Sequence, residues 1–181
     1  YAPVPPGTAS EADTFEDFSQ PNMTSTTPTY WMKASEVYFL RAEAALFWPE
    51  FGDAKTLYKE GIAMSFSENG ITSAVDSYLS SGLQPISVSL SNPINYSAPA
   101  PTKVTPEFTG TNEEKLEKIM IQKWISMYPN GQEAWTEFRR TGYPVLNPVA
   151  VNSGVSQGVT VERGIRRMTY PQSFSQSAED A

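Results

Sequence analysis

Two helices joined by a tight turn are predicted between residues 111 and 142, and this pair limits the fold more than any other feature. The first helix begins at Thr111, which has Glu114 three residues on, the spacing of a capping box. Its apolar residues recur at helical spacing and are expected to be buried: Leu116, Ile119, Met120, Trp124 and Met127. After the turn at residues 129–131, a second helix is predicted from Gln132 to Arg140, because Gly142 lies just past its end.

A second helical pair is predicted near the start of the chain. Its first helix covers residues 34–47, and its second begins at Asp53, a good N-cap, and extends to about residue 66. The expected buried residues are Val37, Leu40, Ala44 and Phe47 on the first helix, and Ala54, Leu57, Tyr58, Gly61, Ile62 and Phe66 on the second. The length and the small residues of this pair are typical of a tetratricopeptide-type hairpin.

The rest of the chain divides into segments of different composition. We expect an acidic arm or loop at residues 1–30 and the helical hairpin, with a short third helix near 73–79, at residues 31–81. A loop rich in Pro and Ser follows at 82–110, then the helical pair at 111–142, then an extended tail at 143–181. For the valines of the tail, a small hairpin is an alternative to the irregular structure that we favour. The expected fold is therefore a single, mainly helical domain of tetratricopeptide-like hairpins with long irregular loops.

The composition argues against an enzyme. The chain has 181 residues, no His and no Cys, and a formal net charge of -7. Without His and Cys it lacks the usual general base, the usual nucleophile pairs and the common zinc ligands. Glu133 and Glu137 suggest a carboxylate pair, but acids four apart on one helix do not face each other across a substrate. We therefore expect no catalytic residue, no metal and no cofactor, and the acidic charge excludes a nucleic-acid partner.

Four motifs in a fixed order over residues 30–172 resemble one protein family. They are Ser35-Glu36-Val37 followed by Ala42-Glu43-Ala44, then Asp53-Ala54-Lys55 with Leu57-Tyr58 and Gly61-Ile62, then the helical pair that closes with Arg139-Arg140-Thr141-Gly142-Tyr143-Pro144, and last Arg166-Arg167-Met168-Thr169-Tyr170-Pro171. Together they are similar to the C-terminal portion of the SusD/RagB family, the SusD-like nutrient-binding lipoproteins on the outer membrane of Bacteroidetes.

This resemblance implies non-catalytic binding of a glycan in an outer-membrane nutrient uptake complex. In the family, a SusC-like TonB-dependent transporter performs the transport, and the ligand is an oligosaccharide or, in some members, a peptide. The expected location is the surface of the outer membrane, with membrane contact only through a lipid anchor outside this chain. A helical-repeat scaffold that binds a protein or peptide is the alternative. A sugar binder should present two or more coplanar aromatic rings, whereas a scaffold should present a concave helical groove.

Five aromatic residues are candidates for contact with a sugar, because aromatic faces pack against the C–H faces of sugar rings. They are Phe15 and Phe18 in the acidic arm, Trp48 and Phe51 between the first two helices, and Tyr96 in the long loop. Tyr96, Phe15 and Phe18 are expected to be the more exposed of these. The tryptophans at positions 31, 124 and 135 are expected in the core.

Three charged residues are expected to be structural. Arg139 and Arg140 lie at the end of a predicted helix, where positive charge complements the helix dipole. Glu43 is flanked by alanines, which leave room for a long partner such as arginine. We predict a buried ion pair between Glu43 and one of these two arginines.

Overall fold

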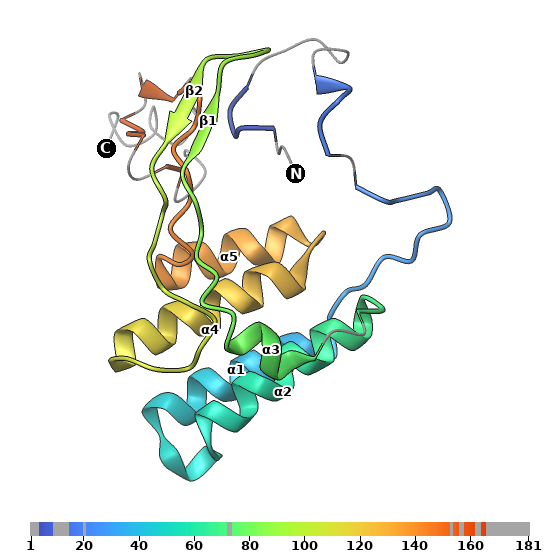
Figure 1. Cartoon of the computed structure of the whole chain (residues 1–181), viewed down its shortest axis with the longest axis vertical. Helices are drawn as coiled ribbons and strands as arrows, with labels where there is room; N and C mark the ends of the chain where they lie inside the picture. Colours follow the sequence, from blue (N-terminus) through green and yellow to red (C-terminus); the bar gives the residue numbers. More distant parts are fainter. Residues whose placement is uncertain are drawn as a thin grey trace, which may run out of the picture. The chain divides into compact units, whose positions relative to one another are not determined.

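The computed structural model describes residues 4–8, 15–19, 21–71, 74–152, 154–155, 158–161 and 164–165. The chain divides into two compact units, one from Gln20 to Asn147 and one formed by Tyr1–Ser19 with Pro148–Ala181. The α-helices and β-strands of the described residues belong to the first unit (Figure 1). The closing motif at 166–171 and part of the acidic arm lie outside the described residues.

Helices make up most of the unit from Gln20 to Asn147. They are α1 (Ala34–Phe47), α2 (Ala54–Glu68), α3 (Val75–Leu79), α4 (Asn112–Met127) and α5 (Gly131–Thr141), with a 3-10 turn η2 (Pro49–Phe51) between α1 and α2. Two short antiparallel strands, β1 (Val88–Leu90) and β2 (Tyr96–Ala98), pair with Val88 opposite Ala98. The mainly helical fold with tetratricopeptide-like hairpins is confirmed.

The helix ends follow the capping signals in the sequence. The Asp53 carboxylate accepts a hydrogen bond from the Thr56 backbone N–H at 2.8 Å and so begins α2. The predicted capping box begins α4, since the Thr111 hydroxyl and the Glu114 carboxylate each accept the other residue's backbone N–H. Gly142 ends α5 in the left-handed conformation, with φ 84°. The predicted boundaries are therefore correct to within about two residues at these helices.

The core lies where α1 packs on α2 and α4. Its buried residues are Phe39, Ala42, Ala45, Leu57, Tyr58, Ile62, Phe108, Ile119 and Met120. Gly61 is required here because a Cβ at this position would lie 2.8 Å from the Phe39 ring. The Tyr58 hydroxyl donates to the carbonyl oxygen of Pro106 at 2.9 Å, which holds the long loop against the helices.

The buried side of α1 differs from the one that the sequence predicts. Val37, Leu40 and Phe47 are 41%, 36% and 47% exposed, whereas the buried residues of this helix are Ser35, Glu36, Phe39, Ala42 and Ala45. The prediction was wrong because α1 is apolar on two opposite sides. Periodicity identifies both sides but does not tell which one faces the core.

The segment at 82–110 also differs from the irregular loop that was expected, because it contains the β1–β2 hairpin. These strands are three residues long, and their Ser residues give them no strong alternating apolar pattern. In the tail, no strand is found among the described residues 143–152, 154–155, 158–161 and 164–165.

Candidate functional site

Phe15 and Tyr96 are buried rather than exposed. Each is only 7% exposed, and Phe15 packs edge-on against Phe18 with the ring centroids 4.9 Å apart. Tyr96 lies in β2 on the buried side of the hairpin, and this burial raises the pKa of its hydroxyl. The expectation that these two rings are exposed was wrong. For Tyr96 the reason is that a Ser- and Asn-rich sequence does not reveal a hairpin with one buried side.

Trp48 and Phe51 present accessible rings in the connection between α1 and α2. Trp48 is 55% and Phe51 60% exposed. The chain leaves α1 in an extended conformation at Trp48, and Pro49 then begins the η2 turn. The Phe47 and Trp48 rings are 6.1 Å apart with their planes at 65°. The surface therefore offers adjacent aromatic rings, but Phe47 and Trp48 are not coplanar.

A further group of exposed rings was not anticipated by the sequence analysis. Trp31, expected in the core, is 93% exposed because it precedes α1 instead of belonging to it, and Tyr30 beside it is exposed as well. Lys33 connects this segment to the end of α4, since its Nζ donates to the carbonyl oxygen of Tyr128 at 2.8 Å. Trp124, in contrast, is partly buried in α4.

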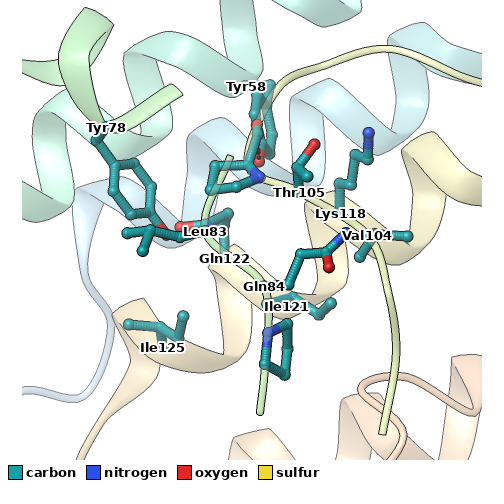
Figure 2. Close-up of a pocket in the computed structure, with 12 residues that line it drawn as sticks. Tyr58, Tyr78, Leu83, Gln84, Val104, Thr105, Lys118, Ile121, Gln122 and Ile125 are labelled. Carbon is teal, nitrogen blue, oxygen red and sulfur yellow. Dashed lines mark hydrogen bonds between the residues drawn. The ribbon is translucent and has the colours of Figure 1, made fainter. Parts of the chain in front are cut away.

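One pocket, of about 170 Å³, lies between α4 and two segments of the long loop (Figure 2). Its lining consists of Tyr58, Tyr78, Leu83, Gln84, Pro85, Val104, Thr105, Pro106, Lys118, Ile121, Gln122 and Ile125. The polar groups contributed by α4 already have partners. The Gln122 amide donates to the Tyr78 hydroxyl at 2.8 Å, and Lys118 Nζ donates to the carbonyls of Glu107 and Thr109 at 2.6 and 2.8 Å. The pocket therefore suits an aliphatic group better than a sugar.

A second pocket, of about 350 Å³, has a more polar lining. It is lined by Lys55, Tyr58, Lys59, Asp76, Leu79, Ser80, Glu107 and Phe108. Lys59 and Asp76 form an exposed ion pair at 2.7 Å, so donors and acceptors stand beside the aromatic residues of this pocket. Tyr58 and Phe108 belong to the core, however, and offer little ring surface. Sequence reasoning missed this pocket because its residues come from three separate segments.

The predicted ion pair of Glu43 forms with Arg140. The Arg140 guanidinium donates two hydrogen bonds of 2.7 Å to the Glu43 carboxylate and also binds Glu137. Arg139 instead lies 4.5 Å from the centre of the Trp135 ring. The Glu43 and Arg140 side chains are 16% and 46% exposed, so the pair lies at the edge of the core and is not buried as predicted.

A buried lysine extends this pair into a charged network. Lys123 is 1% exposed, and its Nζ lies 3.2 Å from Glu137 and 3.7 Å from Glu36, without the geometry of a hydrogen bond. Burial raises the pKa of Glu36 above its ordinary value. Burial also acts to raise the pKa of Glu137, but the hydrogen bonds from Arg140 and the charge of Lys123 outweigh it and lower this pKa. Glu137 is thus held in structural ion pairs and does not face a substrate cleft with Glu133.

In the described part of the chain, no cluster of three or more His, Cys, Asp or Glu side chains could hold a metal ion. None of the described helices has the length and apolar character needed to cross a membrane.

The fold and these surfaces define a helical-hairpin protein with exposed aromatic rings and acids held in structural pairs. Residues 1–181 match the family SusD-like, described as Susd and RagB outer membrane lipoprotein. The chain therefore belongs to the SusD-like family, whose description agrees with the expected location at the outer membrane. Among curated proteins, none matches the chain.

Solved structures of SusD homologues from Bacteroides are similar to the chain. One from Bacteroides ovatus is 44% identical with a TM-score of 0.72, over 81% of this chain and 31% of that one. One from Bacteroides thetaiotaomicron is 43% identical with a TM-score of 0.75, over 87% and 33%. A chitin-binding SusD homologue from Flavobacterium johnsoniae is 40% identical with a TM-score of 0.71, over 83% and 32%. The chain thus spans about a third of the length of these relatives.

Proposed function

We propose that the chain belongs to a non-catalytic, glycan-binding component of an outer-membrane nutrient uptake complex. The observation that carries this proposal is membership of the SusD-like family together with 40% identity to a member that binds chitin. The oligosaccharide would be passed to a TonB-dependent transporter at the cell surface. A role in binding alone also fits a chain without His or Cys, in which Glu137 is held by Arg140 and Lys123.

Within this chain, Trp48 and Phe51 are the proposed contacts for the sugar. Both rings are more than half exposed and stand three residues apart in a short connection between two packed helices. An aromatic ring packs its face on the C–H groups of a sugar and loses little conformational freedom, because it has few rotatable bonds. Phe15, Phe18 and Tyr96 are less suited, since Phe15 and Tyr96 are buried and Phe18 packs on Phe15.

Binding measurements on ring-removing variants test this assignment. Chitin oligosaccharides and a panel of soluble polysaccharides would be titrated into the full-length protein, and binding would be measured by isothermal titration calorimetry. We expect Trp48→Ala to weaken binding of the recognised glycan about tenfold, the effect of one lost aromatic contact. Tyr128→Ala removes a ring of similar exposure elsewhere on the helical unit and should leave the affinity unchanged. If the Trp48→Ala variant and the unaltered protein bind the glycan with equal affinity, Trp48 is not a contact for the sugar.

The apolar pocket of Figure 2 is the observation that favours the alternative, a scaffold that binds a peptide. Ile121 and Ile125 lie one turn apart on α4 and face the loop segments that contain Leu83 and Val104. Ile121→Ser would weaken binding of an apolar peptide at this pocket and would not affect binding of a glycan at Trp48. Peptide binding that is lost in Ile121→Ser, without any affinity for glycans, would establish the scaffold function instead.

A further inference from the structure

The larger pocket of the helical unit, here named the α2–α3 pocket, has the size and the lining of a ligand site. Its volume of about 350 Å³ falls within the range of about 300–1,000 Å³ that is usual for small-molecule sites, whereas the apolar pocket at α4 falls below this range. The α2–α3 pocket lies where α3 packs beside α2, and residues of the long loop complete its wall (Figure 1). Neither Trp48 nor Phe51 lines it.

The loop wall of the α2–α3 pocket is held in place by hydrogen bonds from the helices. The Tyr58 hydroxyl donates to the carbonyl oxygen of Pro106 at 2.9 Å. Lys118 Nζ donates to the carbonyl oxygens of Glu107 and Thr109 at 2.6 and 2.8 Å. Because these bonds fix the backbone on both sides of the Glu107 side chain, the wall is formed before a ligand binds.

Four of the residues that line the α2–α3 pocket are charged, and their charges sum to zero: Lys55, Lys59, Asp76 and Glu107. All four are exposed. Lys59 pairs with Asp76 at 2.7 Å, but an ion pair this exposed contributes little to stability, so a ligand can separate it at low cost. Among the described residues, Lys55 and Glu107 form no salt bridge. The pocket therefore offers two ammonium groups and two carboxylates to a ligand.

These charged groups fit the hydroxyl groups of a neutral sugar. An ammonium group only donates hydrogen bonds and a carboxylate only accepts them, whereas a hydroxyl does both, so neighbouring hydroxyls of one sugar ring can bind a lysine and a carboxylate in turn. Hydrogen bonds to charged groups are also stronger than those between neutral groups. An anionic sugar gains less, because Asp76 and Glu107 repel it while the lysines attract it. Leu79 and Phe108 supply apolar surface for the C–H groups of the ring.

We propose that the α2–α3 pocket binds one neutral sugar residue, with Lys55 and Glu107 among its hydrogen-bonding partners. This inference rests on the proposed function, glycan binding, and adds to it a contact region separate from the exposed rings at Trp48 and Phe51. The volume lies near the lower limit for ligand sites, so the pocket holds a single ring and not a longer oligosaccharide. Hydrogen bonds carry most of the affinity here, because Phe108 is 9% exposed and cannot present a face for stacking.

Charge-removing variants test this assignment. Chitin oligosaccharides and a panel of neutral and acidic polysaccharides would be titrated into the full-length protein and into its Lys55→Met and Glu107→Gln variants by isothermal titration calorimetry. Each variant should bind the recognised glycan about tenfold more weakly, because each loses a hydrogen bond to a charged group. Lys103→Met and Glu60→Gln remove exposed charges of the same kinds outside the pocket and should leave the affinity unchanged. All these side chains are exposed, so the fold should be retained, and circular dichroism would verify it.

Three results would contradict this role of the pocket. If the full-length protein binds a glycan, and Lys55→Met or Glu107→Gln binds it as tightly as the unaltered protein does, the pocket is not the sugar site proposed, although glycan binding itself stands. Equal losses in the pocket variants and in the two control variants would show a general effect of charge instead. Tighter binding in Glu107→Gln, with weaker binding in Lys55→Met, would indicate an anionic sugar and overturn the neutral class. The absence of binding to every glycan would overturn the proposed function as well.

Discussion

Five charged side chains link three helices of the helical unit. Glu36 and Glu43 come from α1, Lys123 from α4, and Glu137 and Arg140 from α5. Lys123 and Glu137 are almost fully buried, whereas Arg140, which bridges Glu137 and Glu43, is near half exposed. The loss in free energy of unfolding when one of these side chains is removed should therefore be larger the more deeply that side chain is buried.

The two adjacent arginines of α5 allow a matched comparison. Arg140→Gln removes the hydrogen bonds to Glu43 and Glu137 and should lower the free energy of unfolding by about 2–3 kcal/mol, less than for a fully buried pair because Arg140 is near half exposed. Arg139→Gln loses only the contact with the Trp135 ring and should cost about 0.5–1 kcal/mol. Urea unfolding of both variants measures the difference. Similar losses of stability in the two variants would show that the ion pairs of Arg140 add nothing to the favourable effect of a positive charge at the end of the helix.

Removal of Lys123 should make stability depend on pH. Lys123→Met leaves Glu36 as a buried carboxylate without a partner and should cost on the order of 3–5 kcal/mol at pH 7. The pKa of Glu36 is already raised in the folded protein, so its ionised form opposes folding, and this penalty decreases as the pH falls toward the ordinary carboxyl pKa. In denaturant titrations, the difference in free energy of unfolding between Lys123→Met and the unaltered protein should therefore decrease from pH 7 to pH 5.

Two results check this account of Lys123. The double variant with Glu36→Gln should recover part of the stability at pH 7, because no unpaired charge then remains at that position. A deficit of Lys123→Met that stays constant from pH 7 to pH 5 would mean that lost packing, and not the charge of Glu36, causes it.

At the residue scale, the sequence predicts an ion pair when the charged partners can be recognised from the residues around them. The partner of Glu43 could be narrowed to Arg139 or Arg140, because the flanking alanines leave space and both arginines end a recognisable helix. The burial of Lys123 could not be predicted, since a lysine in a helix usually faces solvent. Its position three residues after Met120 and four before Met127, both on the apolar stripe, is the signal that could have revealed its burial.

At the element scale, Gly61 determines how closely α1 and α2 approach. Gly61→Ala would place a Cβ 2.8 Å from the Phe39 ring and should destabilise the protein by about 1–3 kcal/mol, despite the better helix propensity of Ala. Gly131→Ala is the matched control, because nothing lies within 4 Å of its Cβ position. Thermal unfolding should show no loss of stability in that control. A Gly61→Ala protein as stable as the control would show that α1 and α2 can separate without cost.

Helix boundaries were predictable because the caps that set them are local. Asp53, the Thr111–Glu114 box and Gly142 each act within a few residues of the chain. The side of α1 that faces the core was not predictable, because that choice depends on which elements cover it. The β1–β2 hairpin escaped prediction for a related reason, since pairing of two three-residue strands is decided by packing and not by propensity.

At the scale of the whole molecule, the chain accounts for about a third of the relatives that it matches. Three aromatic pairs of the helical unit are edge-on or steeply tilted, and the fourth, Tyr58–Phe108 at 33°, is in the core. None of these four pairs is the coplanar platform expected of a sugar binder. We expect this part of the protein to supply the helical framework and single exposed rings, with further sugar contacts in the rest of the protein.

The central claim is that the protein binds a glycan without cleaving it. Calorimetric titration of chitin oligosaccharides and other glycans into the natural-length protein, followed by analysis of the recovered sugar, tests both parts at once. We expect saturable binding of at least one glycan, which is recovered intact with no new reducing ends. Sustained release of reducing ends by a preparation free of other hydrolases, or the absence of binding to every glycan tested, would contradict it.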